Sequence, residues 1–311
     1  MKKFLVLIIT IACSLFVISG CAKESEKSGT ESPTFAPSVP GTEVESVTIE
    51  GITFSKYDMT STWSDDAVKI NMNGSEVTFE GTGARQSGKK VLIEYEGTYI
   101  LSGNLTDGQI VVEVEKTEKV QLVLNGVNIS CSDSAPLYIK SADKVSLTLP
   151  EGSDNVLTDA VNYVFETPGL DKPNSCIFSE DDLTINGTGK LTVNANYNNG
   201  IGTKNDLRII SGTLNVKAVN NALKGNDTVV IKDGTINIES DDDGIKSDNE
   251  TEENRGCVYI FGGTVNIEAG DDSIQAYTKV KITGGTVTEK SIGKDINCEV
   301  IEVTEGCLIN A

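Results

Sequence analysis

Pairs of acidic residues that recur at one position of a repeated sequence have the clearest chemical meaning in this chain. The pairs are Asp242-Asp243 and Asp271-Asp272, and an apolar residue follows two positions later, as Ile245 and Ile274. Carboxylates brought close together repel, and burial disfavours their charged form, so a site holding both pairs needs protons, water or a cation. A surplus of oxygen ligands without nitrogen or sulfur favours calcium, which takes about six to eight of them.

The calcium hypothesis extends to other acids and amides of the same repeats. Asp241 adds a third acid to the first pair, and polar residues recur after the apolar position. The alternative is a solvated acidic face, but a charge run without a structural role would not repeat in register. The candidate metal ligands are Asp241, Asp242, Asp243, Asp248, Asp271, Asp272, Asp227, Asn226 and Asn249.

Asparagine replaces aspartate at the same position of the two preceding repeats. These repeats carry Asn198-Asn199 and Asn220-Asn221. Amides stacked along the axis of a β-structure bond to one another. We therefore expect these asparagines to form structural ladders, so that fewer coils bind metal than the repeat count suggests.

A repeated unit of about 22 residues must position all these side chains. A Gly-Thr step recurs at Gly212, Gly234, Gly263 and Gly285, at intervals of 22, 29 and 22 residues, between runs that alternate apolar and polar residues. Alternation indicates strands with one buried face, and a fixed period in the low twenties is typical of a solenoid. We expect an all-β, right-handed, single-stranded parallel β-helix with about 22 residues and three short strands per rung.

The pattern is less regular at both ends of the repeats. Strands around 44–52, 68–79 and 91–101 are expected to cap the N-terminal end and shield its open edge. The segment from the 150s to 175 is expected to loop out, and the seven extra residues of the 29-residue interval form an acidic loop within 248–256. After Thr288 the sequence leaves the repeat pattern.

The N-terminal residues are typical of an exported protein. Residues 1–20 contain two lysines before an apolar run, as in a secretory signal, and Ile18-Ser19-Gly20-Cys21 matches a bacterial lipobox. A lipid on Cys21 would hold the chain at the outer face of a bacterial cell membrane without a spanning helix; the alternative is an ordinary signal peptide with a chance cysteine. Residues 21–43 have the composition of a disordered linker, which leaves 44–311 as the β-helix domain.

Composition excludes several functions. The chain has 46 acidic against 26 basic residues, a net charge of −20, which repels nucleic acid and anionic lipid head groups. It contains no histidine, so histidine-based catalysis and histidine-ligated zinc are excluded. The five cysteines beyond Cys21 are odd in number and form no CxxC spacing, so we expect small buried strand residues.

Two further residue types bear on function. Flat side chains that combine an apolar body with a polar edge suit sugar rings, and the candidates are Tyr197, Tyr277, Tyr259 and Trp63; each is also explained by ordinary packing. Lys224 and Lys246 share one repeat position, where they can balance the neighbouring acids. Alternatively, Lys246 could abstract a proton from a calcium-bound uronate, as in calcium-dependent pectate lyases, although the surrounding carboxylates favour its protonated form.

Four segments in order resemble one family. They are 97–110, 119–129, 182–201 and 242–249, and the resemblance covers roughly 48–288. The chain is similar to bacterial carbohydrate-binding lipoproteins, typified by a cellulose- and pectin-binding, calcium-containing parallel β-helix cell-surface protein. The resemblance implies calcium at the turn 243–249 and a non-catalytic, extracellular protein that binds plant cell-wall polysaccharide. The alternatives are a calcium-dependent polysaccharide (pectate) lyase with Lys246 as base, and a structural surface adhesin.

Overall fold

The computed structural model describes residues 46–165, 167 and 169–310, which fall within one compact unit, residues 44–311. This described part contains thirty strands and one short helix. None of its helices is long and apolar enough to span a bilayer. The predicted signal peptide, the lipidation of Cys21 and the linker 21–43 lie outside the described residues.

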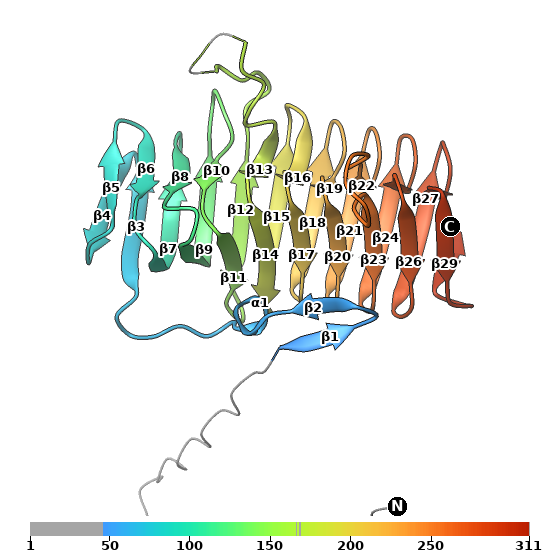
Figure 1. Cartoon of the computed structure of the whole chain (residues 1–311). Coiled ribbons are helices and arrows are strands. Elements are labelled where there is room, and N and C mark those ends of the chain that lie inside the picture. Colours follow the sequence, from blue (N-terminus) through green and yellow to red (C-terminus); the bar gives the residue numbers. More distant parts are fainter. Residues whose placement is uncertain (1–45, 166, 168, 311) are drawn as a thin grey trace, which may run out of the picture. The chain divides into compact units, whose positions relative to one another are not determined.

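Strands make up two large, mostly parallel sheets in the described part of the chain (Figure 1). The ten-stranded sheet contains, in chain order, β5 (Ala84–Ser87), β6 (Lys90–Ile93), β8 (Gln109–Glu113), β10 (Leu137–Ser141), β13 (Ser175–Ser179), β16 (Asn199–Thr203), β19 (Leu223–Gly225), β22 (Ile245–Ser247), β25 (Ile274–Ala276) and β28 (Ile296–Asn297).

The other sheet is nearly closed and barrel-like, with eighteen strands among the residues described. They are β3 (Val68–Gly74), β4 (Glu76–Glu80), β7 (Gly97–Leu105), β9 (Lys119–Ser130), β11 (Lys144–Leu149), β12 (Asp154–Thr158), β14 (Asp182–Gly187), β15 (Lys190–Ala195), β17 (Asp206–Ile209), β18 (Thr213–Ala218), β20 (Thr228–Ile231), β21 (Thr235–Ser240), β23 (Cys257–Ile260), β24 (Thr264–Ala269), β26 (Lys279–Ile282), β27 (Thr286–Ser291), β29 (Val300–Val303) and β30 (Leu308–Asn310).

Register follows the repeat in the sequence. From β14 onward each strand pairs in parallel with the strand three places later, so that Leu207 of β17 aligns with Val229 of β20, which aligns with Val258 of β23. The expected all-β, mostly parallel architecture is confirmed. Sequence intervals therefore become spatial neighbours, and equivalent residues of successive repeats stack in columns.

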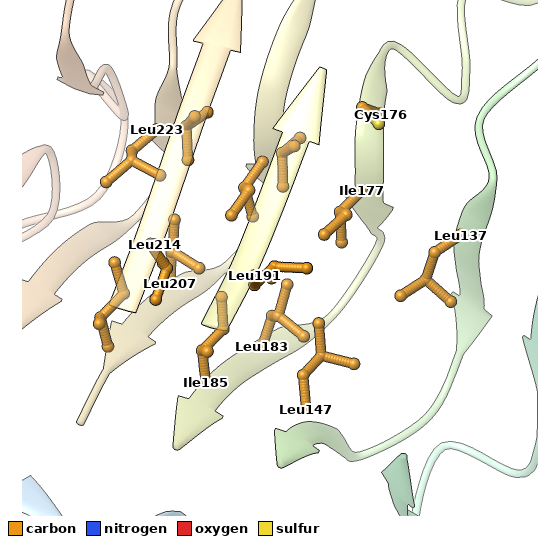
Figure 2. Packing of buried hydrophobic residues seen from close by; sticks show 14 of the residues in the cluster. Leu137, Leu147, Cys176, Ile177, Leu183, Ile185, Leu191, Leu207, Leu214 and Leu223 are labelled. Carbon is orange, nitrogen blue, oxygen red and sulfur yellow. The ribbon is translucent and has the colours of Figure 1, made fainter. Parts of the chain in front are cut away.

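The core lies between the sheets. Alternate residues of each strand point inward, and Figure 2 shows Leu147, Leu183, Leu191, Leu207 and Leu223 converging from different strands. These five leucines are fully buried, and removal of such area from water is the main stabilising contribution. The predicted role of the cysteines in packing is confirmed for the buried ones, and all five described cysteines are unpaired: Cys131, Cys176, Cys257 and Cys307 are buried, and Cys298 is half-buried.

The first described segment does not cap the N-terminal end, contrary to our expectation for 44–52. The antiparallel hairpin of β1 (Val47–Ile49) and β2 (Ile52–Phe54) packs against the side of the eighteen-stranded sheet, where Phe54 meets Ile210 and Val230. The short helix α1 (Lys56–Met59) follows and contacts β14. Two other antiparallel hairpins, β3–β4 and β5–β6, close the N-terminal end of the sheets.

The repeat also continues further than the sequence indicated. β27 to β30 keep parallel pairing, with Val287 aligned with Leu308. The expected break after Thr288 is wrong, because buried Glu289 replaces the isoleucine of earlier repeats and interrupts the apolar pattern without interrupting the strand. Its Oε2 accepts a hydrogen bond of 2.9 Å from Ser273 Oγ. The loop expected from the 150s to 175 is confirmed only after β12, which ends at Thr158.

Candidate functional site

The turns before β22 and β25 bring the repeated acids together. Because Ile245 aligns with Ile274, the residues that precede them lie on adjacent coils. One carboxylate oxygen from each of Asp242, Asp243 and Asp271 lies within 4.8 Å of the others. We call these three residues the acidic cluster. The backbone holds the turns in place, since Asp271 N donates to Asp242 O over 3.1 Å.

Neighbouring groups leave the acidic cluster with excess negative charge. Lys246 Nζ lies 2.7 Å from Asp243 Oδ2, and this is the cation paired with the cluster in the described residues. The pKa of Asp242 is raised by partial burial and then by the negative charges of Asp243 and Asp271. Asp272, the fourth acid of the two pairs, instead accepts hydrogen bonds from Lys294 N at 2.8 Å and Asn297 Nδ2 at 2.6 Å.

A buried amide oxygen belongs to the coil adjacent to the cluster. Asn221 occupies the coil below Asp243, and its Nδ2 donates to Asn199 Oδ1 at 2.8 Å on the far side. Its Oδ1 is buried and has no hydrogen-bond partner among the residues described. An unsatisfied buried oxygen is costly. The three clustered carboxylates are oxygen donors suited to a hard cation, and this oxygen on the adjacent coil is a further donor type.

The remaining predicted ligands do not join the acidic cluster. Asp241 is exposed, and Asp248 lies at the opposite end of β22, where its Oδ2 is 2.7 Å from Lys224 Nζ. On the same side as Asp248, Asp227 accepts a hydrogen bond from Asn249 and forms an ion pair with Arg255. The other predicted ligand, Asn226, donates to Asp227 Oδ1 at 3.2 Å. The three-residue strand β22 separates the acidic cluster from the group of Asp227 and Asp248. Arg255 and Lys224 balance the charges of Asp227 and Asp248.

The asparagine ladders are confirmed. Asn220 Nδ2 donates to Asn198 Oδ1 at 2.5 Å, parallel to the bond between Asn221 and Asn199. These amides stack up to the acidic cluster, so one column changes from amide to carboxylate between adjacent coils. The structure therefore gives the asparagines a structural role and also places one of them beneath the candidate cation site.

Sequence reasoning missed a groove on the outer face of β15, β18, β21, β24 and β27. It has a volume of about 530 Å³. Asn215, Asn237 and Asn266 form a ladder along it, with two successive hydrogen bonds of 2.8 Å. We call this surface the amide groove. The signal was the asparagine that recurs three residues after Gly212, Gly234 and Gly263 of the repeat.

Charged pairs border the ladder in the amide groove. The adjacent column contains Lys217 bonded to Glu239, and Lys290 bonded to Glu268 at 2.7 Å. These exposed pairs are neutral overall and contribute little to stability. The groove therefore offers a row of hydrogen-bonding groups without strong net charge, which suits a ligand rich in hydroxyl groups.

The four aromatic candidates lie apart. Tyr197 stacks on Tyr163 with ring centroids 4.1 Å apart, and Tyr259 packs on Phe261 beneath the N-terminal hairpin. Tyr277 is 47% exposed, and Trp63, 39% exposed, lines a different hollow beside Pro150. Within the described residues these side chains form no shared platform for a sugar chain.

Asp159 beneath the Tyr163–Tyr197 stack supplies a pH-dependent prediction. Burial raises its pKa to about 6, above its ordinary value of 3.8, although Asn196 N and Tyr163 Oη donate to it. The folded state therefore holds this proton more tightly than the unfolded state, and stability is lost as pH rises from about 4 to about 6. The shift corresponds to about 3 kcal/mol.

The variant Asp159→Asn is expected to lose this pH dependence. The melting temperature of the variant minus that of wild type should be larger at pH 7 than at pH 4.5. Calorimetry at both pH values measures this difference. Asp154→Asn, at an exposed carboxylate, serves as the control. Parallel melting curves for wild type and Asp159→Asn at both pH values would show that Asp159 does not titrate as described.

Comparison with known proteins identifies the family to which the chain belongs. Residues 87–306 match the model of the carbohydrate-binding domain-containing protein family. The chain belongs to this family.

One relative and one solved structure give closer points of similarity. A carbohydrate-binding domain-containing protein of Acetivibrio thermocellus is 50% identical over 246 residues, which span 78% of this chain and 86% of the relative. A solved chain described as a polysaccharide lyase-like protein from C. thermocellum, in a gadolinium derivative, is 48% identical with a TM-score of 0.78. That match covers 79% of this chain and 100% of the solved one.

Proposed function

We propose that this protein binds cellulose- or pectin-type polysaccharide of plant cell walls without catalysing a reaction. Membership of a carbohydrate-binding family supports a carbohydrate partner. We also propose that the sheets form a right-handed parallel β-helix with three short strands in about 22 residues per rung, in which strands pair at that interval. In this proposal the protein is extracellular and lipid-anchored through Cys21 at the outer face of a bacterial membrane.

The observation that carries the proposal is the amide groove. Side-chain amides both donate and accept hydrogen bonds, as sugar hydroxyls do. Asn237 and Asn266 each use one Nδ2 hydrogen within the ladder, which leaves the other for a ligand. Adjacent strands are about 4.8 Å apart, a spacing comparable to the length of one sugar unit. Successive units of an extended glycan would therefore meet equivalent groups along the groove.

We further propose that calcium occupies the acidic cluster and braces consecutive turns. Asp242, Asp243, Asp271 and the unsatisfied Asn221 Oδ1 would supply ligands, and solvent the rest. Gadolinium, present in the derivative of the solved relative, is likewise a hard cation that prefers oxygen donors. Calcium at this position could also bridge to uronate carboxylates of a bound glycan.

A sedimentation assay on insoluble cellulose and on pectin gel tests the function. Wild type is expected to bind, and the double variant Asn237→Ala, Asn266→Ala to bind about tenfold more weakly, because it loses two groove amides. Asn73→Ala removes an exposed strand asparagine distant in the fold and should bind normally. Absence of wild type from both materials would favour a structural adhesin, and full binding by the double variant would exclude the amide groove.

The alternative of a polysaccharide lyase rests on Lys246. Its Nζ forms an ion pair with Asp243 Oδ2 at 2.7 Å, so a carboxylate of the acidic cluster already engages this group. Wild type with polygalacturonate and calcium should therefore produce no rise in absorbance from unsaturated product. Steady product formation that disappears in Lys246→Ala would establish the lyase instead.

A further inference from the structure

A polar hollow lies on the outer face of the ten-stranded sheet, apart from both the amide groove and the acidic cluster. Gly202 aligns with Phe178 on one side and Lys224 on the other. A Cβ atom at Gly202 would lie 2.1 Å from Ser175 Oγ, so the position has no room for a side chain. Gly202 is one of the residues that line a hollow of about 250 Å³ at this column.

Two lysines contribute to the lining of this hollow. Lys204 and Lys224 both line it, and Asn174, Asn226 and Asp248 complete its polar part. Lys224 is paired with Asp248 at 2.7 Å, and nearby Lys172 is paired with Glu180 at 3.2 Å. Lys204 Nζ, by contrast, has no carboxylate oxygen within 4.0 Å among the described residues. Among the described residues, Lys204 is therefore the lysine of this hollow that lacks a close ion pair, on a chain of net charge −20.

The surroundings of Lys204 favour an anion at this position. Burial lowers the pKa of Lys204, and the neighbouring charges of Lys172 and Lys224 lower it further, although Glu180 and Asp171 act in the opposite direction. A half-buried cation between two others is stabilised when an anion enters. Hydrogen bonds from ammonium groups to a carboxylate are shorter and stronger than those between neutral groups.

We propose that this hollow binds one uronate residue of an acidic polysaccharide, with the carboxylate between Lys204 and Lys224. Asn174, Asn226 and Asp248 line the remainder, where they can meet the sugar hydroxyls. The inference rests on the proposed polysaccharide binding and adds a chemical class of ligand to it. Recognition here uses lysines rather than a metal ion, so it does not require calcium. A neutral glycan gains nothing from the two cations.

Titration calorimetry with tetragalacturonate in the presence of EDTA separates this subsite from any calcium bridge. Wild type is expected to bind, and Lys204→Gln to bind about tenfold more weakly, because one charge-assisted contact is lost. Lys232→Gln removes the same charge from the turn after β20 and should bind as wild type does. Fully methyl-esterified tetragalacturonate lacks the carboxylate charge, and any binding of it should be equal in the three proteins.

Three results would overturn the subsite. They are no binding of tetragalacturonate by wild type in EDTA, undiminished binding by Lys204→Gln, or an equal loss in Lys232→Gln. Melting curves of both variants verify that each is folded, and Lys204→Arg, which keeps the charge, should restore most of the binding. Cellulose sedimentation is independent of these results, so the subsite can fail while polysaccharide binding at the amide groove holds.

Discussion

Calcium at about a hundred times its dissociation constant is expected to raise the melting temperature of this protein by about 5–10 °C. A ligand that binds only the native state adds about 2.7 kcal/mol to the free energy of unfolding at that concentration. Each kcal/mol raises the melting temperature by about 2–4 °C in a chain of this size. The acidic cluster is the proposed site, since one carboxylate oxygen from each of its residues lies within 4.8 Å of the others. Scanning calorimetry with calcium and with EGTA measures the shift.

The double variant Asp242→Asn, Asp243→Asn should retain the fold and lose the calcium response. It gives this coil the residues that the preceding coil already carries, Asn220 and Asn221, which stack successfully. Glu252→Gln with Glu253→Gln removes the same charge from the exposed loop after β22 and should respond as wild type does. A melting curve unmoved by chelator in wild type, or an equal response in the cluster variant, would end the calcium proposal.

Loss of the Asp58 carboxylate is expected to destabilise the protein by about 3–5 kcal/mol, the scale typical of removing one partner of a buried ion pair. Asp58 is 1% exposed on α1 and accepts from Lys144 Nζ at 2.9 Å and Thr184 Oγ1 at 2.6 Å. It also caps the helix through Ser55 N at 2.8 Å. Among the described residues, Asp58→Ala leaves the largely buried Lys144 ammonium with only the more distant Asp182, at 3.6 Å, and removes the bond from Thr184 of β14 to α1. Denaturant unfolding measures the loss.

The same carboxylate gives a signed pH dependence. Burial raises the pKa of Asp58, but hydrogen bonds from Thr184 and Ser55 and the charge of Lys144 outweigh it, and the pKa lies below its ordinary 3.8. A depressed pKa means that its stabilisation is present above about pH 4 and disappears as pH falls through the folded-state value. The difference in stability between wild type and Asp58→Ala should therefore shrink on acidification. A variant as stable as wild type at pH 7 would contradict this role.

Periodicity made the fold and the acidic cluster predictable. Each acid pair has the same spacing to its apolar residue, Ile245 or Ile274. Because these apolar residues align in parallel register, the acids that precede them lie next to each other on adjacent coils. The same reasoning failed for Asp227 and Asp248. Both follow the short third strand rather than precede it, so they lie at its other end with Arg255 and Lys224.

Other features depended on contacts that periodicity does not encode. The hairpin β1–β2 packs on apolar residues that face outward, such as Ile210 and Val230. The alternating pattern does not predict which segment covers such outward-facing residues. The last coil could not be predicted because Glu289 is buried, whereas a glutamate at that position of the pattern indicates a solvent-facing residue. The groove asparagines resemble the ordinary polar face of a strand, and only their stacked hydrogen bonds distinguish them.

The central claim is that coiling of the chain makes acids 29 residues apart share one cation beside a glycan-binding surface. Crystals grown with calcium and examined by anomalous diffraction test it most directly. The account predicts a peak between the carboxylates of Asp242, Asp243 and Asp271 that disappears in Asp242→Asn, Asp243→Asn. Calcium bound only elsewhere, with these three carboxylates apart or bonded to protein groups alone, would contradict it.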